Sequence, residues 1–187
     1  MNQPTPAGRS AHVTVNSIIL ALTIFIATAS PIPAQEIANP QEAEIKRLMT
    51  EGVQLMAEGS SASLEKAIGK FESARVMVRS LKLQPVDAFI LTMIASAYSA
   101  MGQDQQAIEK YSEALPQLHA AGEKQLEAAT LLQLGLIYDS LNEFQKALDF
   151  ASQAVLLFRA SGDREGEGLA LSAIGNLRGG WVTLRMG

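Results

Sequence analysis

Residues 134–147 read LGLIYDSLNEFQKA, and they contain a glycine inside a run that is otherwise typical of a helix. Glycine in a helix interior costs about 0.5–1 kcal/mol relative to alanine. Gly135 therefore needs a structural reason. Asn142, in the middle of the stretch, is a residue type that accepts the left-handed conformation found at helix ends. The stretch is thus predicted to be two helices joined by a short turn.

The same pattern recurs along the chain at intervals of 40 residues. Residues 94–98 and 107–111 lie 40 positions before residues 134–138 and 147–151, and a fourth beginning follows at Leu171, 40 positions after Leu131. A more divergent copy comes first. A fixed period of this kind is the signature of a repeat architecture. No segment has the pattern of a strand, so the expected fold class is all-α, built from antiparallel helix pairs.

The repeated unit resembles the tetratricopeptide repeat. A small residue precedes an aromatic one in the first helix (Gly135, Tyr138), and Ala107, Tyr111 and Ala114 give the alanine and aromatic spacing of the second helix. The resemblance covers residues 42–178 and implies helix hairpins stacked into a right-handed α-α superhelix. The 40-residue period exceeds the usual 34 and is similar to that of a long-period type common in bacterial proteins.

The resemblance also implies why Gly135 is tolerated. Gly135 and Ala147 stand on opposite helices of one hairpin and are expected to meet where the helices cross, so that the packing gained offsets the cost of glycine. In this unit Ala151 takes the place of the expected aromatic residue, and Phe150 lies one place earlier.

Side chains at helical spacing are predicted to form the core: Leu131, Leu134, Tyr138, Leu141, Phe144, Leu148 and Leu157 in the third unit, and Leu91, Ile94, Tyr98, Ile108, Tyr111 and Leu115 in the second.

The N-terminal region differs from the repeats. Residues 1–34 contain one charge, Arg9, then an apolar run over 17–27 and a small-residue exit, which is typical of a secretory signal peptide cleaved after Ala34 or Ala29. An uncleaved membrane anchor is the alternative. The expected order is signal peptide 1–34, linker 35–41, repeats near 42–82, 86–122 and 126–162, a partial fourth from 166, and an irregular tail over 179–187. The protein is therefore expected to be exported, to the periplasm or the extracellular space, with no membrane association after cleavage.

Composition excludes several classes of function. The 187 residues carry a formal net charge of −4, so there is no basic excess for binding nucleic acid. The absence of cysteine excludes disulfides and thiolate metal sites. His119 is isolated from His12, and the acidic residues around Asp163 are typical of a solvated helix start. We therefore predict no catalytic residues, no cofactor and no metal.

The family resemblance implies a binding groove on the concave face, lined by the first helix of each unit. Its positions are Met49, Val53 and Met56 in the first unit, Phe89, Thr92, Ser96 and Ser99 in the second, Leu132, Leu136 and Asp139 in the third, and Leu169, Ser172 and Asn176 in the fourth. Lys46 is the single cation predicted there. A hydrophobic segment or amphipathic helix of a partner is therefore expected to bind. Alternatively, these residues pack against the opposite wall of a short superhelix.

These features lead to three hypotheses about the function of the protein. The leading hypothesis is a non-enzymatic scaffold that binds a protein or peptide partner in the groove. A second is the N-terminal regulatory portion of a larger protein, because the repeats are similar to those that precede caspase-like peptidase domains in bacterial exported proteins. A third is a structural homo-oligomer that associates through the unfinished fourth repeat, whose outer side carries little charge.

Overall fold

The computed structural model describes residues 40–185, with side-chain burial described for 40–177. The signal peptide expected over 1–34 lies outside the described residues. Seven helices follow one another in this part of the chain: α2 (Pro40–Glu58), α3 (Ser61–Ser80), α4 (Gln84–Ala100), α5 (Asp104–Ala121), α6 (Lys124–Ser140), α7 (Phe144–Ser161) and α8 (Arg164–Arg185). The described residues form no strand, so the all-α prediction is confirmed for this part of the chain.

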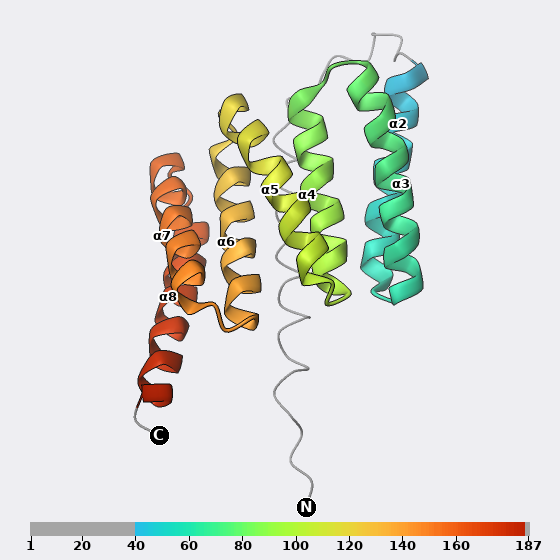
Figure 1. Ribbon diagram of the computed structural model, residues 1–187. Helices are drawn as coiled ribbons and strands as arrows, with labels where there is room; N and C mark the ends of the chain where they lie inside the picture. Colours follow the sequence, from blue (N-terminus) through green and yellow to red (C-terminus); the bar gives the residue numbers. More distant parts are fainter. Residues whose placement is uncertain (1–39, 186–187) are drawn as a thin grey trace, which may run out of the picture.

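The helices form a row of antiparallel hairpins, α2–α3, α4–α5 and α6–α7, with α8 as the last helix (Figure 1). Each helix packs against the next one along the chain. The first helices also approach one another across the hairpins, since α4 contacts α6 and α6 contacts α8. These first helices therefore share one face of the row, which is the face where the binding groove is expected.

The hairpin turns use the left-handed backbone conformation that the sequence suggested. Asn142, between α6 and α7, has a φ of 61°, and its N–H donates to the carbonyl oxygen of Asp139 at 2.9 Å. The N–H of the next residue, Glu143, donates to the carbonyl oxygen of Tyr138 at 2.8 Å. These bonds satisfy carbonyl groups that have no partner within the helix and end α6 sharply.

The close approach expected at Gly135 is confirmed. A Cβ added there would lie 3.2 Å from the carbonyl oxygen of Ala147 and 3.4 Å from the backbone nitrogen of Ala151. The backbone of α7 thus lies directly against α6, and both alanines are buried. Phe150 lies beside this crossing and stacks on Tyr138, with ring centres 5.4 Å apart and ring planes 4° from parallel. The one-place shift of the aromatic residue therefore preserves its contact with the first helix.

The glycine of the first hairpin has a different use. A Cβ added to Gly52 would lie 2.5 Å from the ring of Phe71, which is buried at the position equivalent to Ala151. In the first hairpin the glycine makes room for a ring, whereas in the third it makes room for a helix backbone. The same position of the repeat thus serves two different packing arrangements.

Part of the predicted core is confirmed and one member is wrong. Leu131, Leu134, Leu91, Ile94 and Tyr111 are buried. Leu141 is 42% exposed, because it is the residue at which α6 ends and its side chain no longer faces α7. Alanines at the helix contacts, which the list of expected core side chains did not include, also have no exposed surface: Ala67, Ala74, Ala88, Ala95, Ala97, Ala107, Ala114, Ala128, Ala147, Ala154 and Ala170.

Two expected boundaries are corrected. The linker was placed over 35–41, but α2 already begins at Pro40, since proline is well suited to the first turn of a helix. The irregular tail over 179–187 is wrong as far as Arg185, because α8 continues through Gly179 and Gly180. Each glycine costs about 1 kcal/mol in a helix but keeps the N–H that the helical hydrogen bond requires. None of the described helices is long and apolar enough to span a bilayer.

Candidate functional site

The predicted groove residues come from the first helices α2, α4, α6 and α8. Four of them are buried, namely Leu132 and the three described next. Met56 belongs to the core around Phe71, and Thr92 donates its hydroxyl to the carbonyl oxygen of Phe89 at 2.7 Å. The Ser96 hydroxyl donates to the carbonyl oxygen of Thr92 at 2.8 Å. Met56, Thr92 and Ser96 are therefore core positions and not groove positions, because neighbouring helices cover these sides of α2 and α4.

Ser96 has a second bond, which explains its place in the core. Its Oγ lies 2.8 Å from the hydroxyl oxygen of Tyr111 on α5. Since the Ser96 proton is donated to Thr92, the Tyr111 hydroxyl is the donor in this contact. Burial raises the pKa of Tyr111, so the phenol stays neutral and keeps its proton. The pair joins the two helices of the second hairpin within the core.

The remaining groove residues differ in exposure. Met49, Val53 and Phe89 are half-buried and pack against the first core cluster. Ser99 is half-buried, whereas Leu169 and Ser172 on α8 are exposed. The first two hairpins thus present a largely covered apolar face, and the accessible part of the predicted groove lies towards α6 and α8.

Four of the predicted residues meet at one pocket between α6, α7 and α8. Leu132, Leu136 and Asp139 line it from α6, and Asn176 lines it from α8. Its other lining residues were not predicted as site residues: Gly135, Ala151, Ala173 and Leu177. Ala173 lies three residues before Asn176, and Leu177 lies four residues after Ala173, so helical spacing alone could have found them. We name this hollow the α6–α8 pocket.

Gly135 and Ala151 line the α6–α8 pocket at the crossing of α6 and α7. Neither residue has a side chain larger than a methyl group. Leu132 is buried, while Leu136 is 37% exposed and is the accessible apolar side chain of the pocket. The glycine that allows the helices to cross is therefore also a lining residue of the pocket.

Asp139 is the charged group of the α6–α8 pocket. Within the described residues its carboxylate has no ion pair and no hydrogen bond, and no cation lines the pocket. Burial raises the pKa of the Asp139 carboxyl. The residue also stands in the last turn of α6, where the helix dipole disfavours negative charge. The charge on Asp139 is thus unfavourable in the free protein.

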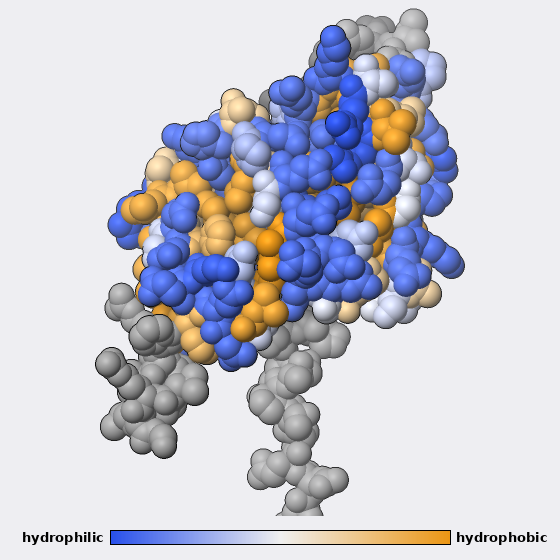
Figure 2. All heavy atoms as spheres, viewed as in Figure 1, coloured by the Kyte–Doolittle hydropathy of each residue, from blue (hydrophilic) through white to orange (hydrophobic). Residues whose placement is uncertain are grey.

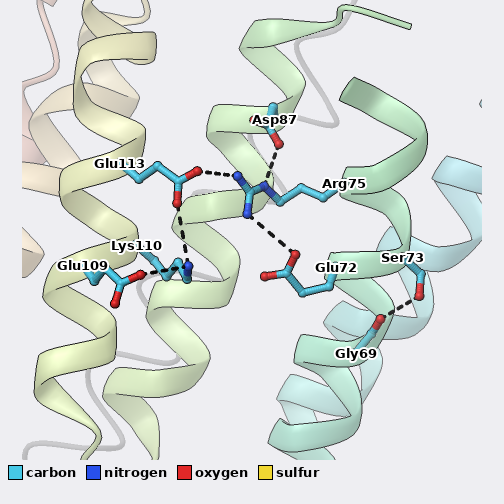
Figure 3. Close-up of polar contacts among 8 residues, drawn as sticks. All are labelled: Gly69, Glu72, Ser73, Arg75, Asp87, Glu109, Lys110 and Glu113. Atoms are coloured by element: carbon cyan, nitrogen blue, oxygen red, sulfur yellow. Dashed lines mark hydrogen bonds and ion pairs between the residues drawn. The ribbon is translucent and has the colours of Figure 1, made fainter. Parts of the chain in front are cut away.

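The charged residues around Arg75 differ from Asp139, because each of them is paired with an opposite charge (Figure 3). Arg75 on α3 is buried, and its Nε donates to Oδ1 of Asp87 on α4 at 2.7 Å. Its two terminal nitrogens contact Glu113 on α5 and, at 3.6 Å, Glu72 on α3. This cluster joins the first hairpin to the second, and we interpret it as a structural link.

Other surface features offer no organised site within the described residues. His119 pairs with Glu127 at 3.0 Å on the surface, and no group of three potential metal ligands comes together in this part of the chain. On the face drawn in Figure 2, hydrophilic residues predominate around patches of hydrophobic surface. Val76 on α3 and Leu156 on α7 are the most exposed large apolar residues among those described.

Comparison with known proteins agrees with this fold. Residues 86–160, which span nearly all of the second and third hairpins, match the family described as Tetratricopeptide repeat. No curated protein sequence matches the chain. Helical repeats of this kind are typical of scaffolds for protein–protein interaction and are generally not catalytic.

Two solved structures share the arrangement of helices. The crystal structure of the apo form of RapI superimposes with a TM-score of 0.69 at 16% sequence identity, covering 92% of this chain and 60% of that one. BtubC (BKLC) from P. vanneervenii gives a TM-score of 0.64 at 17% identity, covering 93% and 66%. The chain thus spans less than two thirds of either structure, and identities this low support the fold alone. The predicted tetratricopeptide-type solenoid is confirmed as the fold class.

Proposed function

We propose that this protein is an exported, non-enzymatic scaffold that binds a peptide or helical segment of a partner protein on the face formed by the first helices. The observation that carries the proposal is the α6–α8 pocket, which brings together four residues predicted from sequence for this role. Its apolar walls suit the burial of a side chain, which is how grooves of this kind bind apolar segments.

The test uses a displayed library of random 12-residue peptides, selected on the full chain. Leu136→Glu places a charge at the exposed side of the pocket and should abolish binding of the selected peptides. Leu156→Glu is the matched control, because Leu156 is 63% exposed on α7 and does not line the pocket. Circular dichroism should show both variants folded. Equal binding by the two variants would overturn the proposal for this face.

A second candidate function is self-association through α8. Leu169 and Leu171 on this last helix are 48% and 47% exposed. Leu171 does not line the α6–α8 pocket, so Leu171→Glu separates the two candidates. Light scattering should show a change from oligomer to monomer in this variant if α8 forms an interface between copies. A wild-type protein that is already monomeric would exclude this candidate.

A further inference from the structure

The α6–α8 pocket combines apolar walls with one carboxylate that has no partner among the described residues. Leu132, Leu136 and Leu177 provide the apolar surface, and Asp139 lies among them with Asn176 close by. Among the described residues, Asp87 is the one carboxylate that is fully buried, and it accepts a hydrogen bond from Arg75. Asp104 and Glu123 are half-buried without a described side-chain partner, as Asp139 is, but neither of them lines this pocket. The distinguishing feature of Asp139 is therefore its place in an apolar pocket.

Asp139 is also placed where its charge does not help the fold. It lies at the carboxyl end of α6, where backbone carbonyl groups already give a partial negative charge. A half-buried carboxylate next to this end of a helix, with no partner in the described part of the chain, is unfavourable in the free protein. Residues that cost stability in this way are typical of functional sites.

Charge complementarity then indicates the partner. An ammonium or guanidinium group placed beside Asp139 would be attracted by the carboxylate and by the end of the α6 dipole together. The α7 residue that lines the pocket is Ala151, and the described α8 residues are Ala173, Asn176 and Leu177, so no lining residue within 40–177 repels a cation. The side-chain amide of Asn176 offers a further oxygen that can accept a hydrogen bond.

From this arrangement we infer that the α6–α8 pocket recognises a basic-apolar segment of a partner protein, in which an apolar side chain enters between Leu132, Leu136 and Leu177 and a neighbouring Lys or Arg pairs with Asp139. The inference rests on the proposed function and specifies its partner. The apolar side chain supplies burial, and the cation supplies selectivity. A segment with an acidic residue at the same place is repelled by Asp139.

The experiment repeats the peptide selection with Asp139→Lys beside the wild-type chain. Wild type should enrich peptides that carry Lys or Arg next to a large apolar residue, and Asp139→Lys should enrich Asp or Glu at that place. For a peptide selected on wild type, Asp139→Asn should weaken binding about five- to tenfold, since a partly exposed charge pair is lost. Asp149→Asn is the matched control, because Asp149 is an exposed aspartate on α7 outside the pocket, and it should retain wild-type affinity.

The outcomes separate the two proposals. Peptides that require Leu136 but show no preference for basic residues would overturn this inference and leave the proposed function standing. An absence of selected peptides, or peptides unaffected by Leu136→Glu, would overturn both. Wild-type binding should also weaken as salt is added, whereas binding of the same peptide to Asp139→Asn should change little.

Discussion

Replacing Gly135 by leucine tests the central packing feature of the fold. A Cβ at this position already lies 3.2 Å from the carbonyl oxygen of Ala147, closer than the 3.5–4.0 Å or so of an ordinary carbon contact. The neighbouring atoms belong to the α7 backbone, which cannot rotate away as a side chain can. A leucine adds three more carbon atoms beyond the Cβ, so α6 and α7 must separate.

Overpacking of this kind costs about 1–3 kcal/mol. Gly69 provides the matched control, because it lies inside α3, it is exposed, and a Cβ added there would meet nothing within 4 Å. Gly69→Leu should raise the free energy of unfolding by about 0.5–1 kcal/mol through helix propensity alone. The same substitution is therefore expected to have opposite signs at the two sites.

Urea unfolding of the full chain, followed by the helical circular dichroism signal, measures both variants. For a domain of this size, each kcal/mol corresponds to a shift of about 2–4 °C in Tm, so a thermal melt provides a second reading. The reasoning is wrong if Gly135→Leu is as stable as wild type, or if the two variants change stability in the same direction by similar amounts. Either result would mean that α6 and α7 do not approach closely at Gly135.

Three further predictions address the polar groups. Arg75→Met leaves the buried Asp87 without its partner and should cost about 3–5 kcal/mol in urea unfolding, whereas adding Asp87→Leu to it should restore part of the loss. Tyr111→Phe removes the hydroxyl that donates to Ser96 and should cost about 0.5–1.5 kcal/mol, so an unchanged melt would contradict the bond. Burial raises the pKa of Asp139 in the folded protein, so wild-type stability should fall as pH rises through that raised pKa; Asp139→Asn should lack this fall, and parallel pH profiles of unfolding would refute it.

The repeat architecture could be predicted because its signals are local. A glycine or asparagine ends each first helix, and small residues recur at positions where two helices cross. Gly135 was correctly assigned to such a crossing, since few roles other than close packing offset a glycine inside a helix. The use of Gly52 to accommodate the ring of Phe71 is equally local, because both residues belong to one hairpin.

The candidate site could be predicted only in part. Helical spacing and the family resemblance placed Leu132, Leu136 and Asp139 on one side of α6, and the structure brings Asn176 of α8 to the same pocket. The same reasoning misplaced Ser96, because spacing gives the direction of a side chain and not how much of it the neighbouring helices cover. Its bond to Tyr111 depends on the register of α4 against α5.

The order of the helices, their hairpin turns and the crossing at Gly135 are thus determined by the amino-acid sequence, since each depends on residues within one hairpin. The burial of Met56, Thr92 and Ser96 and the link from Arg75 to Glu113 depend on the packing between helices. The lack of a described partner for Asp139 also depends on the packing between helices. The described side chains of α7 and α8 that reach the end of α6 include none that pairs with its carboxylate. How far neighbouring helices cover a side chain depends on their packing in three dimensions, which no periodicity along the chain specifies.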